Sequence, residues 1–121
     1  MITPPRSATI LVVDDDPLVR RWAVLALKAA GHRVYEANGA AKAMALFEEI
    51  EAEVGILLTD IRMPEMDGLA LAEWVRRRAP DTRVIYMTGF SDRIIEPDAV
   101  VLLKPFTVET LRQAIARSAS L

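Results

Sequence analysis

The apolar positions of the chain fall into five short runs that are separated by longer amphipathic stretches. The length and β-branched content of these runs favour strands. Three of them lack alternating polar positions, which is typical of strands that are covered on both faces. The predicted strands are residues 9–13, 33–37, 54–59, 83–88 and 100–103.

Helical patterns lie between the predicted strands. The first has Pro17 at a first helical position, Asp16 before it as a cap and Gly31 just beyond its end. The segment 89–99 has room only for a turn or two of helix. The predicted helices are residues 17–30, 39–50, 69–79 and 108–119.

Strand and helix alternate along the chain, which predicts a parallel sheet with right-handed connections. We therefore expect a doubly wound α/β domain over residues 9–119. Residues 1–8, which include Thr3-Pro4-Pro5, are expected to form a short N-terminal arm.

Composition narrows the class of protein. A chain of 121 residues, 52% hydrophobic and 26% charged, fits one globular domain. The net charge of −2 gives no electrostatic argument for direct contact with nucleic acid or an anionic membrane. There is no cysteine, no apolar run that could cross a bilayer and no secretion-signal core, so we expect a cytoplasmic protein without membrane insertion.

Polar side chains stand where the predicted strands end. Asp14 and Asp15 follow the first strand, Asp60 the third, Thr88 the fourth and Lys104 the fifth. In a parallel sheet these ends lie along one edge, where ligands bind in doubly wound folds. Each residue alone is explained more simply as a cap, a turn residue or a solvated side chain. Their joint occurrence at successive strand ends predicts a site.

Three carboxylates repel one another in a small space, by roughly 4 kcal/mol for a pair about 4 Å apart at an effective dielectric near 20. A hard divalent cation removes that cost, and magnesium prefers oxygen ligands. Lys104 adds a positive charge and Thr88 a hydroxyl donor for phosphoryl oxygens. Because carboxylates can act as nucleophiles that become aspartyl phosphates, Asp60 is a candidate acceptor beside Mg²⁺.

Four segments together resemble the receiver domain of two-component response regulators. They are ILVVDDDPLVR (10–20), LLTDIRMPEMDG (57–68), VIYMTG (84–89) and LLKPFT (102–107). The resemblance covers nearly the whole chain. It implies a flavodoxin-like (βα)5 fold with a five-stranded parallel sheet in the order 2-1-3-4-5.

The resemblance also implies a reaction. Asp60 matches the phospho-accepting aspartate of the family, and a phosphohistidine on a sensor histidine kinase or histidine phosphotransfer protein would be the donor. Asp15, Asp60 and the backbone carbonyl of Arg62 would ligate Mg²⁺ directly, and Asp14 would act mainly through water. The chain would be a signalling module rather than an enzyme, although it would assist its own phosphorylation and dephosphorylation.

The resemblance assigns further roles. Thr88 and Lys104 would bind phosphoryl oxygens, and Lys104 would pair with Asp60 before phosphorylation. Pro105 follows a peptide bond that the family often has in the cis form. Gly68 would lead the loop after Asp60 into the next helix.

Two departures from the family pattern affect the readout. Val101 stands where the family has an aromatic switch residue, and valine has no ring to move between rotamers. Thr88 and Lys104 lie closer together in the chain than is usual in the family, so the fourth helix is expected to be short or missing. This weakens any expectation of a dimer through that region, and the oligomeric state stays open.

Two other functions compete with the phosphorylated receiver. One is a phosphatase of the haloacid-dehalogenase type, with Asp14 as nucleophile and Asp16 as acid. The other is a degenerate receiver that binds partners without phosphorylation. For the receiver itself, output through a downstream protein or domain is expected. The chain is either a free-standing regulator or the receiver module of a hybrid histidine kinase.

Overall fold

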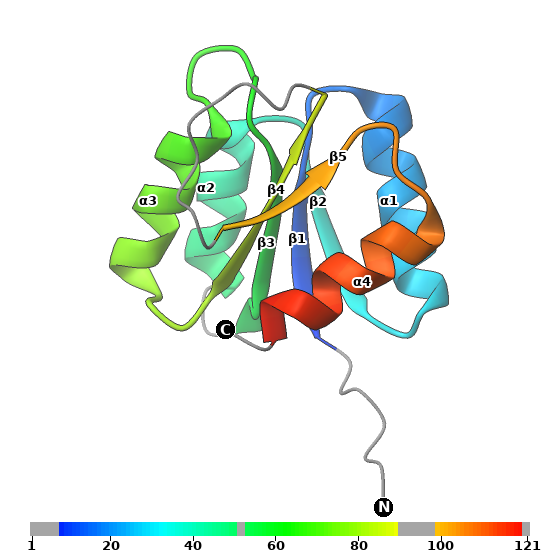
Figure 1. The fold of residues 1–121 in the computed structure, drawn as a ribbon. Helices are drawn as coiled ribbons and strands as arrows, with labels where there is room; N and C mark the ends of the chain where they lie inside the picture. Colours follow the sequence, from blue (N-terminus) through cyan, green and yellow to red (C-terminus); the bar gives the residue numbers. More distant parts are fainter. Residues whose placement is uncertain (1–7, 51–52, 90–98, 120–121) are drawn as a thin grey trace, which may run out of the picture.

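The computed structural model describes residues 8–50, 53–89 and 99–119, and these residues form a three-layer α/β domain (Figure 1). Five parallel strands make one sheet in the order β2-β1-β3-β4-β5. This confirms the predicted fold class and strand order. The strands are β1 (Thr9–Val13), β2 (Arg33–Ala37), β3 (Ile56–Asp60), β4 (Arg83–Thr88) and β5 (Val100–Leu103).

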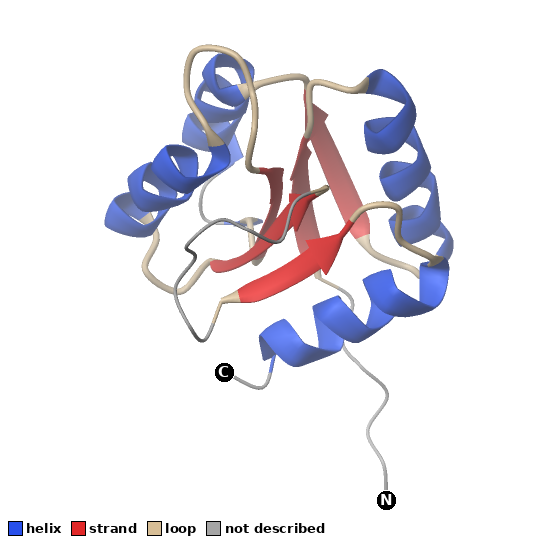
Figure 2. Cartoon of the chain, turned by 45° about the horizontal axis from the view of Figure 1, so that its top comes forward, coloured by secondary structure: helices blue, strands red, loops and turns tan. Residues whose placement is uncertain are grey.

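Four α-helices occur within the described ranges, and they cover the sheet in pairs. α2 and α3 lie on one face of the sheet, while α1 and α4 lie on the other (Figures 1 and 2). None of them is long and apolar enough to span a membrane. The helices are α1 (Pro17–Ala29), α2 (Ala40–Ile50), α3 (Gly68–Arg78) and α4 (Val108–Ala119).

Alternate side chains of each inner strand enter two different cores. Leu11 and Val13 of β1 pack with residues of α2 and α3, whereas Ile10 and Val12 pack with residues of α1 and α4. β1, β3 and β4 are buried over almost their whole length. The apolar runs of these three strands are therefore covered on both faces, as predicted for runs without alternation, whereas the apolar run of β5 is not.

The helix ends follow the local sequence. The Asp16 side chain accepts hydrogen bonds from the amides of Leu18 and Val19, so it is the predicted cap of α1. After α1, Gly31 has a φ of 95°, a conformation that glycine adopts without strain. α3 begins at Gly68, one residue before the predicted start, because the Asp67 side chain caps it by accepting from the amide of Ala70.

Two predicted segments fall mainly outside the described residues. The short fourth helix was expected within residues 89–99, of which 90–98 are not described. Residues 1–7 of the predicted arm are not described either. Ala8 is held by the fold: its amide donates to Nδ1 of His32 over 3.0 Å, and its carbonyl accepts from the amide of Arg33 over 3.0 Å.

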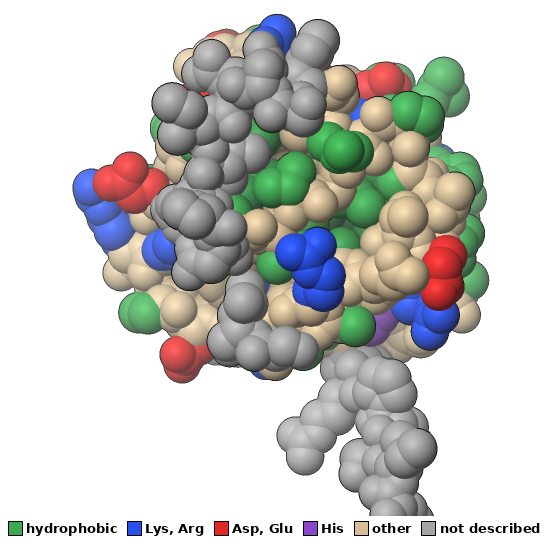
Figure 3. All heavy atoms as spheres, viewed as in Figure 1, with side chains coloured by type: hydrophobic (Ala, Val, Ile, Leu, Met, Phe, Trp, Pro, Cys, Tyr) green, Lys and Arg blue, Asp and Glu red, His purple; other side chains and the backbone are tan. Residues whose placement is uncertain are grey.

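β5 ends the row of strands and is only partly covered by the described residues. Val100 and Leu102 are buried on the side of α1 and α4, while Val101 is half-buried and Leu103 is 52% exposed. Hydrophobic side chains gather on the face of the molecule drawn in Figure 3, and acidic and basic side chains are interspersed around them. Charge is therefore mixed on this face rather than collected in one area.

Candidate functional site

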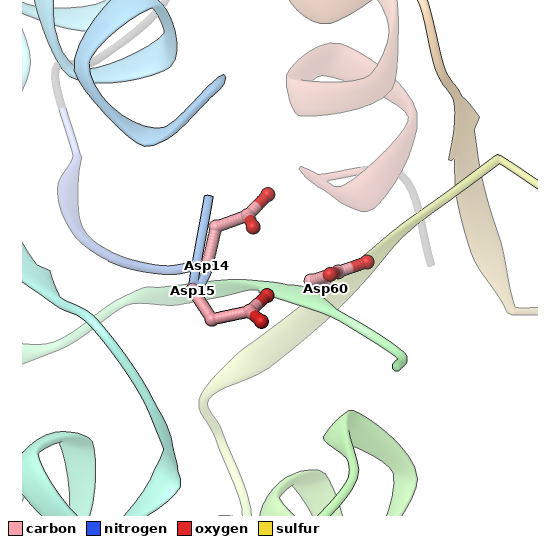
Figure 4. A group of neighbouring side chains, drawn as sticks. All are labelled: Asp14, Asp15 and Asp60. Atoms are coloured by element: carbon pink, nitrogen blue, oxygen red, sulfur yellow. The ribbon is translucent and has the colours of Figure 1, made fainter. Parts of the chain in front are cut away.

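The order of the strands brings the three predicted carboxylates together. β1 lies beside β3, with Val13 opposite Thr59, so the residues that follow Val13 lie next to Asp60 at the end of β3. One oxygen from each of Asp14, Asp15 and Asp60 can be chosen so that all three lie within 4.8 Å of one another (Figure 4). The predicted acidic cluster is therefore present at the carboxyl edge of the sheet.

Asp14 is completely buried, and both of its carboxylate oxygens have partners. Oδ1 accepts from the amide of Asp16 over 2.9 Å, and Oδ2 lies 2.9 Å from Nζ of Lys104. The Asp14 amide donates to the carbonyl of Ala37 at the end of β2 over 3.2 Å. A buried carboxylate needs such partners, because an unpaired charge in the interior is very unfavourable.

Lys104 joins the two sides of the site. Its Nζ lies 2.9 Å from Oδ2 of Asp14 and 3.3 Å from Oδ1 of Asp60. The Lys104 amide donates to the carbonyl of Thr88 over 2.8 Å, which places the end of β4 directly beside the lysine. Thr88 itself is buried. The ends of β1, β3, β4 and β5 thus meet around Lys104.

Burial and charge shift the titration of the central residues. Burial, followed by the charge of Asp14, raises the pKa of Asp60 above 3.8, although Lys104 acts in the opposite direction. Burial alone would lower the pKa of Lys104, but the hydrogen bond to Asp14 and the charges of Asp14 and Asp60 outweigh burial and raise it. The site therefore holds more negative charge than its lysine compensates, and an added cation would relieve this.

Two hydrogen bonds of Arg20, next to the site, were not predicted from the sequence. Nη1 of Arg20 donates to the backbone carbonyl of Asp14 over 2.8 Å, and Nε of the same guanidinium donates to Oε1 of Glu36 over 3.1 Å. The residues around Arg20 give no signal for these contacts, because the helix dipole acts mainly within the first turn of a helix. Arg20 stands in the second turn of α1, and Glu36 is the penultimate residue of β2.

The loop after Asp60 brings α3 against the site. The Gly68 amide donates to the carbonyl of Ile61 over 2.8 Å. A Cβ atom on Gly68 would overlap the carbonyl oxygen of Asp60 and lie 2.9 Å from its carbonyl carbon. Glycine is therefore required here because two stretches of backbone approach closely. Within this loop Glu65 takes a φ of 72°.

The remaining predicted residues lie around the cluster or away from it. The peptide bond between Lys104 and Pro105 is cis, as the family resemblance implied. Arg62 lies two residues beyond Asp60, and it is exposed. Val101 lies on β5, opposite Tyr86 of β4, and it is half-buried. β5 is one strand further from the acidic cluster than β4.

The donor set fits a hard divalent cation. All three clustered side chains offer carboxylate oxygens, and the raised pKa of Asp60 reflects negative charge held at a buried position. Magnesium binds through one or two carboxylates while it keeps several waters, which suits one exposed ligand, Asp15, beside two buried ones. Asp14, Asp15 and Asp60 could hold such an ion.

Comparison with known proteins agrees with this geometry. A family model described as the response regulator receiver domain matches residues 10–116. The response regulator receiver protein CpdR of Brucella abortus is 38% identical over 115 residues, which cover 89% of this chain and 93% of CpdR.

A second relative is a much larger protein. The sensor kinase CckA of Brucella abortus is 36% identical over 115 residues, which cover 90% of this chain but 12% of the kinase. The chain therefore corresponds to a small part of that relative's length. Among solved structures, the receiver domain of a hybrid histidine kinase CckA superposes with a TM-score of 0.81 at 29% identity, covering 92% of this chain and 98% of that domain.

Proposed function

Since the chain belongs to the response regulator receiver domain family, we propose that it is a phosphorylated signalling module whose acceptor is Asp60. The phosphoryl donor is a phosphohistidine on a sensor histidine kinase or a histidine phosphotransfer protein. The phosphorylated chain then changes its interactions with a downstream protein or domain. We propose that residues 9–119 are the receiver unit and that it works in the cytoplasm.

One observation carries the proposal. Lys104 contacts Asp60 in a cluster whose three carboxylates offer oxygens within 4.8 Å of one another. A carboxylate with a raised pKa and a neighbouring ammonium is the environment expected of a functional acid rather than of a surface turn. Asp60 is also less deeply buried than Asp14, with 8% exposure against 0%, so an incoming group meets Asp60 first.

In the proposed transfer, an oxygen of Asp60 bonds to phosphorus while the bond between phosphorus and the donor imidazole nitrogen breaks. The imidazole leaves with the electron pair of that bond and is protonated. Lys104 and the Thr88 hydroxyl stabilise the negative charge on the transferring oxygens. Because these groups stand at fixed strand ends, they need little rearrangement during the reaction.

Mg²⁺ belongs to this proposal as the cation that Asp14, Asp15 and Asp60 hold, together with the carbonyl of Arg62. When bound, it would neutralise charge on the carboxylates and the phosphoryl oxygens. Asp15 and Asp60 would be direct ligands and Asp14 a water-mediated one. The Lys104–Asp14 contact supports this division, because Lys104 already occupies one of the two oxygens of Asp14.

The competing assignment of Asp14 as nucleophile of a phosphatase is weakened by its surroundings. Asp14 is fully buried, and both of its oxygens are already engaged, by the Asp16 amide and by Lys104. An attacking oxygen needs access to phosphorus, which complete burial denies to Asp14. Asp60 retains more exposure, and it is the residue that matches the acceptor position of the family.

The test is incubation of the chain with Mg²⁺ and a small acyl phosphate, followed by intact-protein mass measurement. We expect one added phosphoryl group on the wild type and none on Asp60→Asn. Asp81→Asn, a change at an exposed turn residue, is the matched control and should be modified like the wild type.

Two outcomes would overturn the acceptor assignment. Modification of Asp60→Asn at the wild-type rate, together with its loss in Asp14→Asn, would favour the phosphatase reading. A folded wild type that is modified neither by acyl phosphate nor by a phosphohistidine donor would favour a degenerate receiver. In that case beryllofluoride with Mg²⁺ should also leave the amide spectrum unchanged.

A further inference from the structure

We propose that Arg20 is a positioning residue for the acidic loop, holding Asp14 and Asp15 in the geometry that binds the cation. The inference rests on the proposed metal site and adds a residue to it that carries no carboxylate. The loop in question is the short connection between β1 and α1, residues 14–16.

Arg20 connects the loop after β1 to the side chain of Glu36 on β2. Its side chain is 18% exposed, and the guanidinium donates in two directions, to the carbonyl of Asp14 over 2.8 Å and to Glu36 over 3.1 Å. A guanidinium is planar, always charged and presents its donors in a fixed fork. It therefore fixes the Asp14 carbonyl relative to the carboxylate of Glu36, which is carried by the neighbouring strand β2.

This contact bears directly on Asp15, which is exposed and follows the clamped carbonyl. The peptide group before Asp15 is held through its carbonyl by Arg20, and the peptide group after Asp15 is held through the Asp16 amide by Oδ1 of Asp14. Both peptide planes beside Asp15 are thus tied down. These two bonds restrain the backbone at Asp15 and with it the direction of the Cα–Cβ bond from which the carboxylate extends.

A second arginine provides a matched comparison. Arg21 also pairs with Glu36, at 3.4 Å, but its side chain is 61% exposed, and among the described residues its guanidinium contacts Glu36 and not the Asp14 carbonyl. Removal of either arginine takes one positive charge from the same carboxylate. Only removal of Arg20 releases the Asp14 carbonyl. The pair therefore separates positioning of the loop from the general effect of charge near the acidic cluster.

The experiment compares wild type, Arg20→Gln, Arg20→Lys and Arg21→Gln. Mg²⁺ affinity is measured by titration followed through backbone amide shifts. Exchange of the Asp16 amide is measured in metal-free protein. We expect Arg20→Gln to weaken Mg²⁺ binding by about tenfold, the lower end for loss of a group that orients ligands from outside the coordination shell. The Asp16 amide should exchange faster in this variant without any metal.

The control should behave differently. We expect Arg21→Gln to keep its Mg²⁺ affinity within about twofold, since exposed ion pairs contribute little. Arg20→Lys retains the charge but replaces the planar fork of donors with a single nitrogen, so it should resemble Arg20→Gln. It also keeps the test decisive if the glutamine variant unfolds.

The outcomes separate this inference from the proposed function. Equal Mg²⁺ affinity and equal Asp16 exchange in Arg20→Gln and wild type would overturn the positioning role while the metal site stands. Equal losses in Arg20→Gln and Arg21→Gln would overturn it too, because charge would then explain both. A wild type that binds no Mg²⁺ would overturn the metal site and this inference with it.

Discussion

The ammonium of Lys104 lies closer to Asp14, at 2.9 Å, than to Asp60, at 3.3 Å. Lys104 and Asp14 are 90 positions apart in the chain, and β3 and β4 lie between β5 and β1 in the sheet. The lysine side chain therefore reaches across the carboxyl ends of two strands to a fully buried carboxylate. Without a cation, Lys104 is the main compensation of Asp14, and Asp60 receives only part of its charge.

Replacement of this lysine should destabilise the metal-free fold. In Lys104→Met the buried Asp14 carboxylate loses its ion pair, and removal of one partner from such a pair costs about 3 kcal/mol. Urea unfolding in the presence of a chelator measures the loss. Lys42→Met, at an exposed position of α2, should change the free energy of unfolding by less than about 0.5 kcal/mol.

Added Mg²⁺ should restore part of the lost stability in Lys104→Met, because a bound cation again balances the carboxylates. A ligand that binds only the folded state raises its stability as ligand concentration increases. A Lys104→Met variant as stable as wild type in chelator would show that the Asp14–Lys104 pair makes no net contribution.

The raised pKa of Asp60 predicts an unusual pH dependence. Because burial raises this pKa above 3.8, the folded chain keeps the proton at pH values where the unfolded chain has released it. The contribution of Asp60 to stability is therefore fully present below pH 3.8 and is lost as pH rises through the raised pKa. In chelator at neutral pH, Asp60→Asn should be more stable than wild type.

Urea unfolding of both proteins across this pH range measures the effect. The stability advantage of Asp60→Asn should grow as pH rises from 3.8 and then become constant. Saturating Mg²⁺ should reduce the advantage, since the ion stabilises wild type more than the variant. An advantage that shrinks with rising pH would contradict the direction of the pKa shift.

The close backbone approach at Gly68 predicts a costly substitution. Gly68→Ala places a methyl group against the carbonyl of Asp60, so the start of α3 or the end of β3 must move. Overpacking of this kind costs about 1–3 kcal/mol. The variant should also accept phosphoryl groups more slowly. Gly39→Ala, where a Cβ would meet nothing within 4 Å, is the control for both urea unfolding and phosphorylation rate.

His32 predicts a second pH effect at the opposite end of the sheet. Its Nδ1 accepts a hydrogen bond from the Ala8 amide, and burial lowers the pKa of the imidazole below 6.5. The folded chain therefore binds this proton less readily than the unfolded chain. The contribution of His32 to stability is fully present above pH 6.5 and is lost as pH decreases through the lowered pKa.

His32→Asn tests this, since an amide oxygen can accept the Ala8 bond without titrating. Thermal unfolding of wild type should show a Tm that decreases below pH 6.5, and the decrease should be smaller in His32→Asn. Identical pH profiles for the two proteins would exclude the imidazole as the cause.

The sheet and the acidic cluster could be predicted because each depends on a repeating pattern. Uninterrupted apolar runs marked β1, β3 and β4, and the polar residues that end the strands had to meet at one edge. Asp16 caps α1 through local hydrogen bonds, as predicted. The cap depends only on neighbouring residues, whereas the cluster depends on the parallel arrangement of the strands.

What the sequence did not reveal depends on distances between distant segments. Arg20 reads as one of two adjacent arginines on a helix, and only the packing of α1 beside β2 distinguishes it from Arg21. The shorter distance from Lys104 to Asp14 than to Asp60 depends on where the ends of β1, β3 and β5 lie in the folded chain. The start of β3 at Ile56 rather than Val54 is a similar detail, set where the neighbouring strands begin to pair.

The position of β5 has a consequence for how the molecule is made. During translation, Asp14, Asp15 and Asp60 are synthesised long before residue 104. A nascent or truncated polypeptide that stops short of β5 therefore carries the acids without their ammonium. With Asp60 as the proposed acceptor, phosphoryl acceptance should thus begin only after synthesis has passed β5.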